Sequence, residues 1–230
     1  MTPLRQTIVF FDIDGTLLHI RGAGRRAFTL ALKDVFGLED EIEYINFAGA
    51  TDLQVLEDVT RNHDHTLRDG DAERFFVALE KAFRVTVNEG EATLFPGVRE
   101  LIESLSSDDR YLLGLITGNI ESCARMKLKR FHLHGHFFLG AFGHEHADRT
   151  EIARLAMTRA RTGADRATGE RCYLVGDTPS DVRAAHAIGA TAVAVATGSF
   201  SQDALTEAGA DHVFEDLGNL ENVLNVLAVT

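Results

Sequence analysis

Two aspartates separated by one residue, Asp12 and Asp14, follow an apolar run, and Gly15 comes directly after them. The run, residues 8–11, predicts a buried strand, and the glycine predicts a sharp turn at its end. Such a turn can bring both carboxylates into one cavity, where like charges need a cation or a shared proton. Phosphoryl transfer uses such a pair, because one carboxylate can attack phosphorus while its neighbour handles the proton.

A second pair of acids, Asp177 and Asp181, follows the apolar run of residues 172–175. Carboxylates grouped around a phosphate need a hard cation, and Mg²⁺ prefers oxygen ligands while keeping several waters. Asp177 stands at a predicted strand end. Asp181 lies one helical turn further on, where we expect it to orient a ligand rather than bind the metal. Capping of a helix that begins near Pro179 is the alternative role for Asp181.

Two further segments have the composition of a phosphate site. Thr117, Gly118 and Asn119 follow a strand-like run and offer a hydroxyl, a close backbone approach and free amides at a helix start. The same three residues also fit ordinary helix entry, with Asn119 as the N-cap. Arg149 opens a helical pattern and can bind a phosphate through two parallel hydrogen bonds. A solvated surface arginine is the alternative interpretation of Arg149.

Strand-like and helical patterns alternate through most of the chain. The predicted strands are residues 7–11, 111–116, 137–142, 172–175, 191–196 and 212–214. The predicted helices between the later strands are residues 120–131, 150–162, 179–188 and 202–208. This alternation predicts an α/β fold with a doubly wound, mostly parallel sheet that is covered on both faces. Because ligands bind at the carboxyl ends of such strands, Asp12, Thr117 and Asp177 are expected to meet in one crevice.

One interval interrupts the alternation. Residues 20–91 show no convincing strand, but they contain helical patterns at residues 25–36, 52–61 and 72–87. Glycines bracket the interval on both sides, and Pro96 begins a new helix after it. We interpret residues 20–91 as a small all-helical cap inserted into an α/β core formed by residues 1–19 and 92–230.

Four motifs in this order resemble those of the haloacid dehalogenase-like (HAD) hydrolases. They are residues 12–16, residues 117–119, Arg149 and residues 176–181. The resemblance covers about residues 7–197 and is to the phosphoglycolate phosphatase-like branch, whose members carry a helical cap after the first motif. Arg149 is a departure, since most members have a lysine as the third motif.

The resemblance implies a mechanism as well as a fold. Asp12 is expected to attack phosphorus and form an aspartyl-phosphate, while Asp14 protonates the leaving oxygen and then takes a proton from water. Asp12 and Asp177 are expected to bind Mg²⁺ through their side chains and Asp14 through its backbone carbonyl. Thr117, Gly118, Asn119 and Arg149 would bind the phosphate. The acid role of Asp14 needs a raised pKa, which a cap that closes over the site could supply by desolvation.

The predicted activity is therefore Mg²⁺-dependent hydrolysis of small-molecule phosphomonoesters. A phosphomutase acting on a sugar phosphate keeps both aspartates, so the motifs leave that alternative open. A non-turnover module that binds phosphate or a partner is the alternative from another class; the cap and Asp14 favour turnover. Within the cap, residues 49–52 resemble the family's specificity segment, with Ala50 where related sequences often have a basic residue. The motifs do not identify the natural substrate.

Composition narrows the protein class. The 230 residues are 45% hydrophobic and 25% charged, which suits a globular protein and not a membrane protein. A net charge of -12 argues against nucleic acid as a partner. The two cysteines indicate reduced thiols and, with no secretory pattern at the N-terminus, a cytoplasmic location. Oligomeric state has no signal in the sequence.

Five histidines crowd residues 132–146. Alternating histidines on an extended strand could bind zinc. Because no cysteine accompanies them, we favour the interpretation that they are polar residues on the loops around the third strand.

Overall fold

Six parallel strands form the central sheet of the computed structural model, which describes residues 5–162 and 167–228. In spatial order they are β5 (Leu139–Phe142), β4 (Tyr111–Thr117), β1 (Arg5–Phe11), β6 (Ala167–Gly176), β7 (Thr191–Val195) and β8 (His212–Phe214). The chain builds the sheet outward from β1 in one direction and then, from β6, in the other. The predicted doubly wound α/β fold is confirmed.

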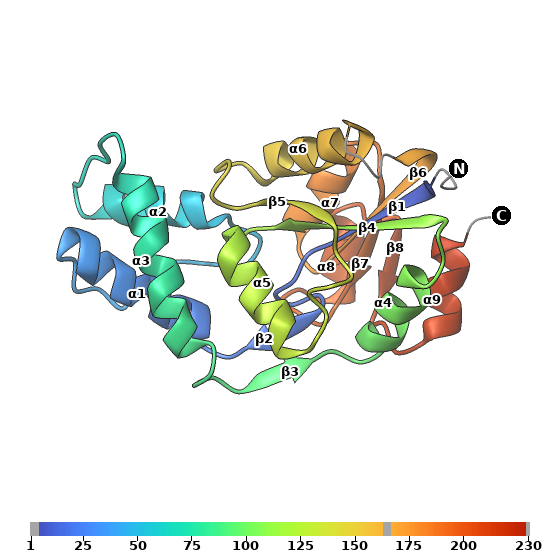
Figure 1. Cartoon of the computed structure of the whole chain (residues 1–230), viewed down its shortest axis with the longest axis horizontal. Coiled ribbons are helices and arrows are strands. Elements are labelled where there is room, and N and C mark those ends of the chain that lie inside the picture. The colour runs from blue at the N-terminus through green and yellow to red at the C-terminus, as the bar shows by residue number, and fades with distance from the viewer. Residues whose placement is uncertain (1–4, 163–166, 229–230) are drawn as a thin grey trace.

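Side chains of β1 alternate between the two faces of the sheet, as a buried parallel strand requires. Ile8 and Phe10 join one apolar cluster, and Val9 and Phe11 join the other. The first cluster includes residues of α6 (Arg149–Thr162) and α7 (Pro179–Ala187). The second includes residues of α4 (Val98–Ser106), α5 (Glu121–Arg130) and α9 (Leu220–Leu227). Helices therefore cover both faces of β1 (Figure 1).

Three helices lie together beyond one end of the sheet (Figure 1). We call α1 (Ala23–Phe36), α2 (Asp52–Asn62) and α3 (Asp71–Thr86) the helical lobe. The chain enters and leaves this lobe through a two-stranded antiparallel ribbon, β2 (Leu18–Ile20) and β3 (Ala92–Leu94). The lobe contains the three helices predicted for residues 20–91, while the domain boundaries themselves stay a prediction.

Some elements have no counterpart among the predicted ones. Strands β2 and β3 have three residues each, too few to establish a period of two. Helix α9 does carry a helical pattern, since Leu220, Val223, Leu224 and Leu227 follow the spacing i, i+3, i+4 and i+7. Helix α8 (Gln202–Glu207) lies within its predicted range. None of the helices in the described part of the chain combines the length and apolar character that crossing a bilayer demands.

The helical lobe docks on the sheet through the start of α2. The backbone N–H of Asp52 donates to Gly118 O (2.7 Å), and Thr51 Oγ1 donates to Ala147 O (2.9 Å). Gly118 lies so close to the lobe that a Cβ placed on it would be 2.0 Å from Ala50 O. A glycine at position 118 is therefore a condition for the contact between lobe and sheet.

We expect Gly118→Ala to destabilise the protein by about 1–3 kcal/mol, because the lobe or the loop after β4 must shift to accommodate the methyl group. Gly24→Ala is the matched control, because a Cβ at Gly24 meets nothing within 4 Å. Gly24 lies in the first turn of α1, so alanine there is expected to be neutral or to stabilise by about 0.5–1 kcal/mol. Urea unfolding of the two variants measures the difference in their unfolding free energies. Equal stabilities of Gly118→Ala and Gly24→Ala would contradict the prediction.

Candidate active site

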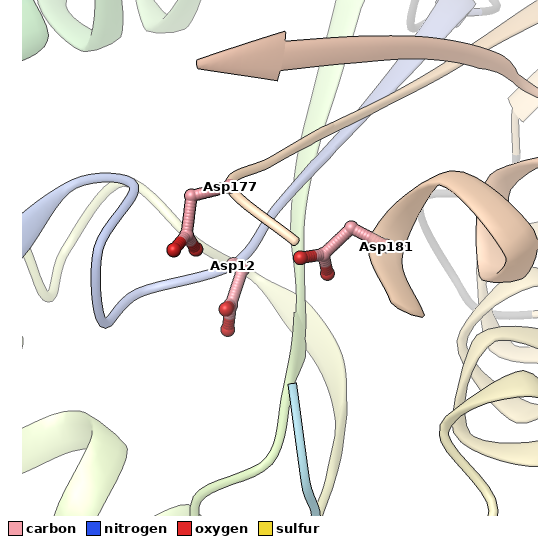
Figure 2. Close-up of side chains that lie close together, drawn as sticks. All are labelled: Asp12, Asp177 and Asp181. Atoms are coloured by element: carbon pink, nitrogen blue, oxygen red, sulfur yellow. The ribbon is translucent and has the colours of Figure 1, made fainter. Parts of the chain in front are cut away.

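Three carboxylates meet where β1 and β6 end. Asp12 directly follows β1 and Asp177 directly follows β6, while Asp181 lies in the first turn of α7. Figure 2 shows the three side chains gathered around one point, and one oxygen of each lies within 4.8 Å of the others. All three residues are buried. The adjoining cavity of about 650 Å³ is lined by Asp12, Asp14 and Asp177, so the structure brings the first and fourth motifs together.

Arg149, the first residue of α6, reaches into this cluster. It is only 6% exposed, and its Nη2 lies 2.9 Å from Asp12 Oδ2 and 2.6 Å from Asp181 Oδ1. The same nitrogen donates to Ile116 O at 3.3 Å. These contacts exclude the solvated surface arginine of the sequence-based alternative. They place the third-motif cation directly against Asp12.

Asp181 uses both of its oxygens within the protein. Oδ1 accepts from Arg149 Nε (2.8 Å), and Oδ2 accepts from Thr178 N (3.0 Å) and Thr178 Oγ1 (2.7 Å). Thr178 Oγ1 also accepts from Asp181 N, which completes a capping box at the start of α7. The capping role considered for Asp181 is therefore present, and the same side chain contacts Arg149; its orientation of a metal ligand stays a prediction.

Burial and mutual repulsion disfavour the charged forms of Asp12 and Asp177. Burial raises the pKa of Asp12 to about 6, and Arg149 opposes that rise. Burial, with the charges of Asp181 and Asp12, raises the pKa of Asp177 to about 8. Asp177 Oδ1 also accepts a hydrogen bond from Thr16 Oγ1 (3.1 Å), which acts in the opposite direction.

The charge balance of the cluster suits a divalent cation. Three carboxylates share one ion-paired cation, Arg149, among the described residues, which leaves two negative charges when all are ionised. The available donors are hard oxygens, the ligands that Mg²⁺ and Ca²⁺ prefer. Asp12 and Asp177 suit ligation better than Asp181, because both oxygens of Asp181 are already engaged. The buried acidic cluster thus fits a divalent metal.

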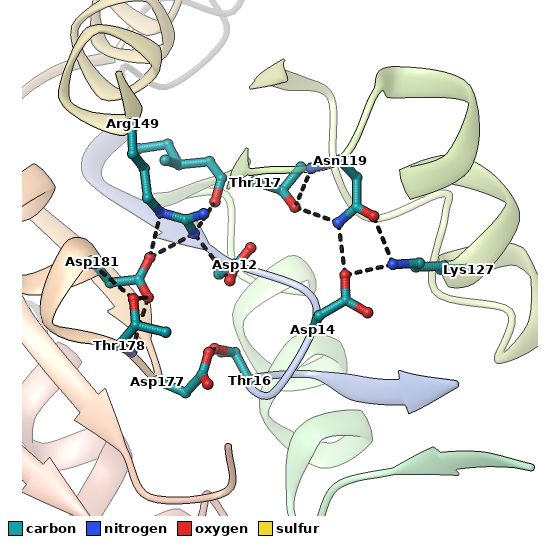
Figure 3. A network of polar contacts seen from close by, with 11 residues as sticks. Asp12, Asp14, Thr16, Thr117, Asn119, Lys127, Arg149, Asp177, Thr178 and Asp181 are labelled. Atoms are coloured by element: carbon teal, nitrogen blue, oxygen red, sulfur yellow. Dashed lines mark hydrogen bonds and ion pairs between the residues drawn. The ribbon is translucent and has the colours of Figure 1, made fainter. Parts of the chain in front are cut away.

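The other half of the site surrounds Asp14. Asn119 Nδ2 donates to Asp14 Oδ2 (2.7 Å) and to Thr117 Oγ1 (2.8 Å), and Lys127 Nζ lies 2.5 Å from the same Asp14 oxygen (Figure 3). The N-cap of α5 is Ile120, so the alternative interpretation of Asn119 as the N-cap does not hold. The side-chain amide of Asn119 instead links the second motif to Asp14.

The pKa of the Asp14 carboxyl shifts in the direction opposite to the one expected from the sequence. Burial tends to raise its pKa, but the charge and hydrogen bond of Lys127, together with Asn119, outweigh burial and lower the pKa below its ordinary value of 3.8. A raised pKa was expected from desolvation under the cap. That expectation was wrong because it did not include Lys127, which contacts the carboxylate from α5.

A family model for haloacid dehalogenase-like hydrolases matches residues 9–195, which include all four motifs. The chain belongs to the haloacid dehalogenase-like hydrolase family. The family resemblance stated from the motifs is therefore confirmed. The order of the motifs along the chain corresponds to one site in space, because β1, β4 and β6 lie side by side.

Related proteins agree over nearly the whole length of this hydrolase. A 5'-nucleotidase of Pseudomonas aeruginosa is 28% identical over 222 residues, which are 96% of each chain. A predicted phosphatase from Clostridium acetobutylicum has a similar structure, with a TM-score of 0.70 and 20% identity over 98% of this chain and 100% of that one. A predicted phosphoglycolate phosphatase from Haemophilus somnus also has a similar structure, with a TM-score of 0.66 and 20% identity over 95% of this chain and 97% of that one. These two structures support the fold.

The backbone of this hydrolase needs glycine where the first motif turns. Gly15 has φ +82°, and a Cβ there would lie 2.3 Å from Asp177 Oδ2. Gly198 makes an even closer approach, since its Cβ would lie 1.8 Å from the same oxygen. Neither position can carry a side chain without moving Asp177.

The histidine-rich stretch takes no part in the site. His136 Nδ1 contacts Ser106 Oγ (2.9 Å), and His146 Nδ1 accepts from Asp148 N (2.9 Å). Among residues 5–162 and 167–228, the group of three or more side chains that could hold a metal ion is the cluster of Asp12, Asp177 and Asp181. It contains none of these histidines. The structure gives no support for the zinc alternative.

Lys127 and Thr16 are the site residues that sequence reasoning missed. Thr16 contacts Asp177, and Lys127 contacts Asp14. A signal for Lys127 was present: it shares the buried face of α5 with Cys123, Ala124 and Leu128, where a lysine is unusual. The helical pattern alone did not identify the partner of its ammonium group.

The contact between α2 and α5 predicts a pH dependence of stability. Asp52 Oδ2 accepts a hydrogen bond from Ile120 N (2.8 Å), and burial raises the pKa of Asp52 to about 6. An acid with a raised pKa in the folded state costs stability once it ionises, so its contribution declines as pH rises from about 4 to 6. The side-chain amide of the Asp52→Asn variant can accept the same hydrogen bond without carrying a charge.

We therefore expect the stability of Asp52→Asn relative to the wild type to increase as pH rises from 4 to 6. Above pH 6 the difference in unfolding free energy between the two proteins should stay constant. Urea unfolding at four pH values between 4 and 7 measures the difference. The exposed Asp34→Asn serves as the control, and its difference from the wild type should stay nearly constant. Parallel stability curves for Asp52→Asn and the wild type would contradict the role of burial.

Proposed function

We propose that this hydrolase is a Mg²⁺-dependent phosphatase that hydrolyses small-molecule phosphomonoesters through an aspartyl-phosphate on Asp12. The observation that carries the proposal is the position of Asp12, which contacts a buried guanidinium and lines one cavity with Asp14. A nucleophile and a proton-transfer group on one cavity wall are what phosphoryl transfer to a carboxylate requires. A cytoplasmic location stays a prediction from the sequence.

In the first step an oxygen of Asp12 forms a bond to phosphorus as the bond from phosphorus to the leaving oxygen breaks. Asp14 gives a proton to that oxygen, which leaves as an alcohol. The negative phosphate beside Asp14 opposes the effect of Lys127 on its pKa, which favours the protonated acid in the complex. Arg149 stays against Asp12 and balances charge on the transferred group.

In the second step water attacks phosphorus and Asp14 takes its proton. The bond between phosphorus and Asp12 breaks, and the Asp12 carboxylate is restored with inorganic phosphate. Asp14 gave its proton to the leaving oxygen in the first step, so it is ionised and can accept that proton. A phosphomutase would admit a second substrate hydroxyl in place of water, so product analysis separates the two activities.

The remaining residues bind phosphate and metal in this proposal. Thr117, Gly118, Asn119 and Arg149 bind the non-bridging oxygens. The side chains of Asp12 and Asp177 and the backbone carbonyl of Asp14 would hold Mg²⁺, while Asp181 orients Arg149. When bound, Mg²⁺ supplies positive charge that stabilises the phosphoryl oxygens during transfer.

The lining of the cavity supports an uncharged, partly apolar leaving group. Large apolar side chains from the helices of the lobe and the segment between α1 and α2 line the cavity: Phe28, Phe47, Leu79 and Phe83. Arg25 donates to the carbonyls of Ile42 and Ile45, and its guanidinium stacks on Phe47. The other described lysine and arginine side chains of the lining, Lys127 and Arg149, pair with site aspartates. A second anionic group on the substrate would have to compete with these partners.

Asp12→Asn should lower the rate of phosphate release from 4-nitrophenyl phosphate by at least ~10³-fold, because the nucleophile is lost. EDTA should abolish release by the wild type, and added Mg²⁺ should restore it. The exposed Asp34→Asn is the control and should retain activity. Release that persists in Asp12→Asn, or that occurs once per enzyme molecule only, would contradict the proposal.

A matched pair of esters tests the leaving group. We expect kcat/KM for phenyl phosphate to exceed that for 4-carboxyphenyl phosphate by ~10-fold or more, because an unpaired carboxylate in the cavity loses hydration. Ala50→Arg, which adds a cation to the cavity lining, should narrow the ratio. Equal constants for the two esters in the wild type would refute this part of the proposal. Nucleoside monophosphates belong in the first metabolite panel, given the 5'-nucleotidase relative.

A further inference from the structure

Helix α5 directs one of its two lysines into the site. Lys127 is 5% exposed, whereas Lys129, two residues later, is exposed to solvent. A buried ammonium group needs partners that replace its lost hydration. Nζ of Lys127 has two such partners, Asp14 Oδ2 at 2.5 Å and Asn119 Oδ1 at 2.6 Å. The lysine side chain thus extends from α5 to the predicted acid–base residue.

The three side chains form a closed triangle. Asn119 Nδ2 donates to the same Asp14 oxygen at 2.7 Å, so each member of the triangle contacts the other two (Figure 3). Two donors that hold Oδ2 from different directions restrict rotation of the carboxylate, while Oδ1 stays outside the triangle. Asp14 lines the same cavity as Asp12, which is where an ester must bind to meet the nucleophile.

The triangle also contacts the helical lobe. Nζ of Lys127 lies 5.5 Å from the centroid of the Phe83 ring, which belongs to α3. An ammonium group over an aromatic face gains electrostatic stabilisation. Lys127 therefore joins α5, the first motif and the lobe at one point, although no step of the proposed reaction requires it to bind phosphate.

We propose that Lys127 is a positioning residue, which together with Asn119 holds Asp14 so that Oδ1 faces the leaving oxygen of the bound ester. This inference rests on the proposed phosphatase function and adds to it a residue that acts through Asp14. Such a residue matters in proportion to how much the leaving group needs a proton. A residue that only supports the fold, or only binds phosphate, affects all esters alike.

Two esters of similar size provide the test. Nitrophenolate leaves 4-nitrophenyl phosphate readily without a proton, whereas the alkoxide of 4-nitrobenzyl phosphate needs one. We expect Lys127→Met to lower kcat/KM for the nitrobenzyl ester by ~10²-fold and for the nitrophenyl ester by less than ~10-fold. Phosphate release measures both, and kcat/KM is used because it reports the steps up to the first transfer.

Three further variants support the interpretation of that ratio. Lys129→Met changes the exposed lysine of the same helix and should leave both constants unchanged. In Asp14→Asn, adding Lys127→Met should not change the ratio further, because a residue that acts through Asp14 has nothing left to position. Lys127→Gln keeps a hydrogen-bond donor and should give an intermediate ratio. It also provides the measurement if circular dichroism shows that Lys127→Met does not fold.

The outcomes separate the two levels of the proposal. If the wild type releases phosphate and the ratio of the two constants is the same in Lys127→Met and Lys127→Gln as in the wild type, the positioning role is overturned while the phosphatase function stands. A further change of ratio in the Asp14→Asn background would also overturn it, since Lys127 would then act on the substrate directly. If the wild type releases phosphate from neither ester, the phosphatase function fails, and the positioning role fails with it.

Discussion

The site depends on the contact between Arg149 and the two buried carboxylates of Asp12 and Asp181. Removing one member of a buried ionic group typically costs about 3–5 kcal/mol, because the remaining charge loses its compensation. Each member comes from a different element: Asp12 follows β1, Arg149 begins α6 and Asp181 lies in α7. The cluster therefore constrains the relative positions of a strand and two helices, and the strand order places these elements next to one another.

The sequence predicted those features that depend on local pattern. Apolar runs located β1, β4 and β6, and the rule that ligands bind at strand ends placed Asp12 and Asp177 on one cavity. Of the second motif, Gly118 and Asn119 line that cavity, while Thr117 is buried beside Asn119. The position of Arg149 after the third predicted strand, at the start of a helix, together with the family resemblance, selected it as the third-motif cation. These inferences worked because a parallel sheet converts order along the chain into proximity at one edge.

Features that depend on distances between side chains could not be predicted in the same way. The direction of the pKa shift of Asp14 follows from Lys127, which approaches it from helix α5 and is 113 residues away in sequence. Asn119 had the composition of an N-cap, but its amide finds a carboxylate across the site. Whether a polar side chain caps its own helix or bridges to another element depends on the packing of both elements, which no local pattern contains.

The contact between the lobe and the sheet uses main-chain acceptors on the sheet side. Asp52 N and Leu53 N donate to the carbonyls of Gly118 and Gly143, and Thr51 Oγ1 donates to the carbonyl of Ala147. Gly118 and Gly143 must lack a side chain, because a Cβ there would lie 2.0 Å from Ala50 O and 1.7 Å from Gly118 O, respectively. Apart from these two glycines, the acceptors on the sheet side place no demand on side-chain identity, because main-chain carbonyls are the same for every amino acid. The aromatic residues of the lobe that line the cavity take no part in these hydrogen bonds. A fold of this kind can acquire new substrates during evolution by changing its lobe, with the reaction centre left intact.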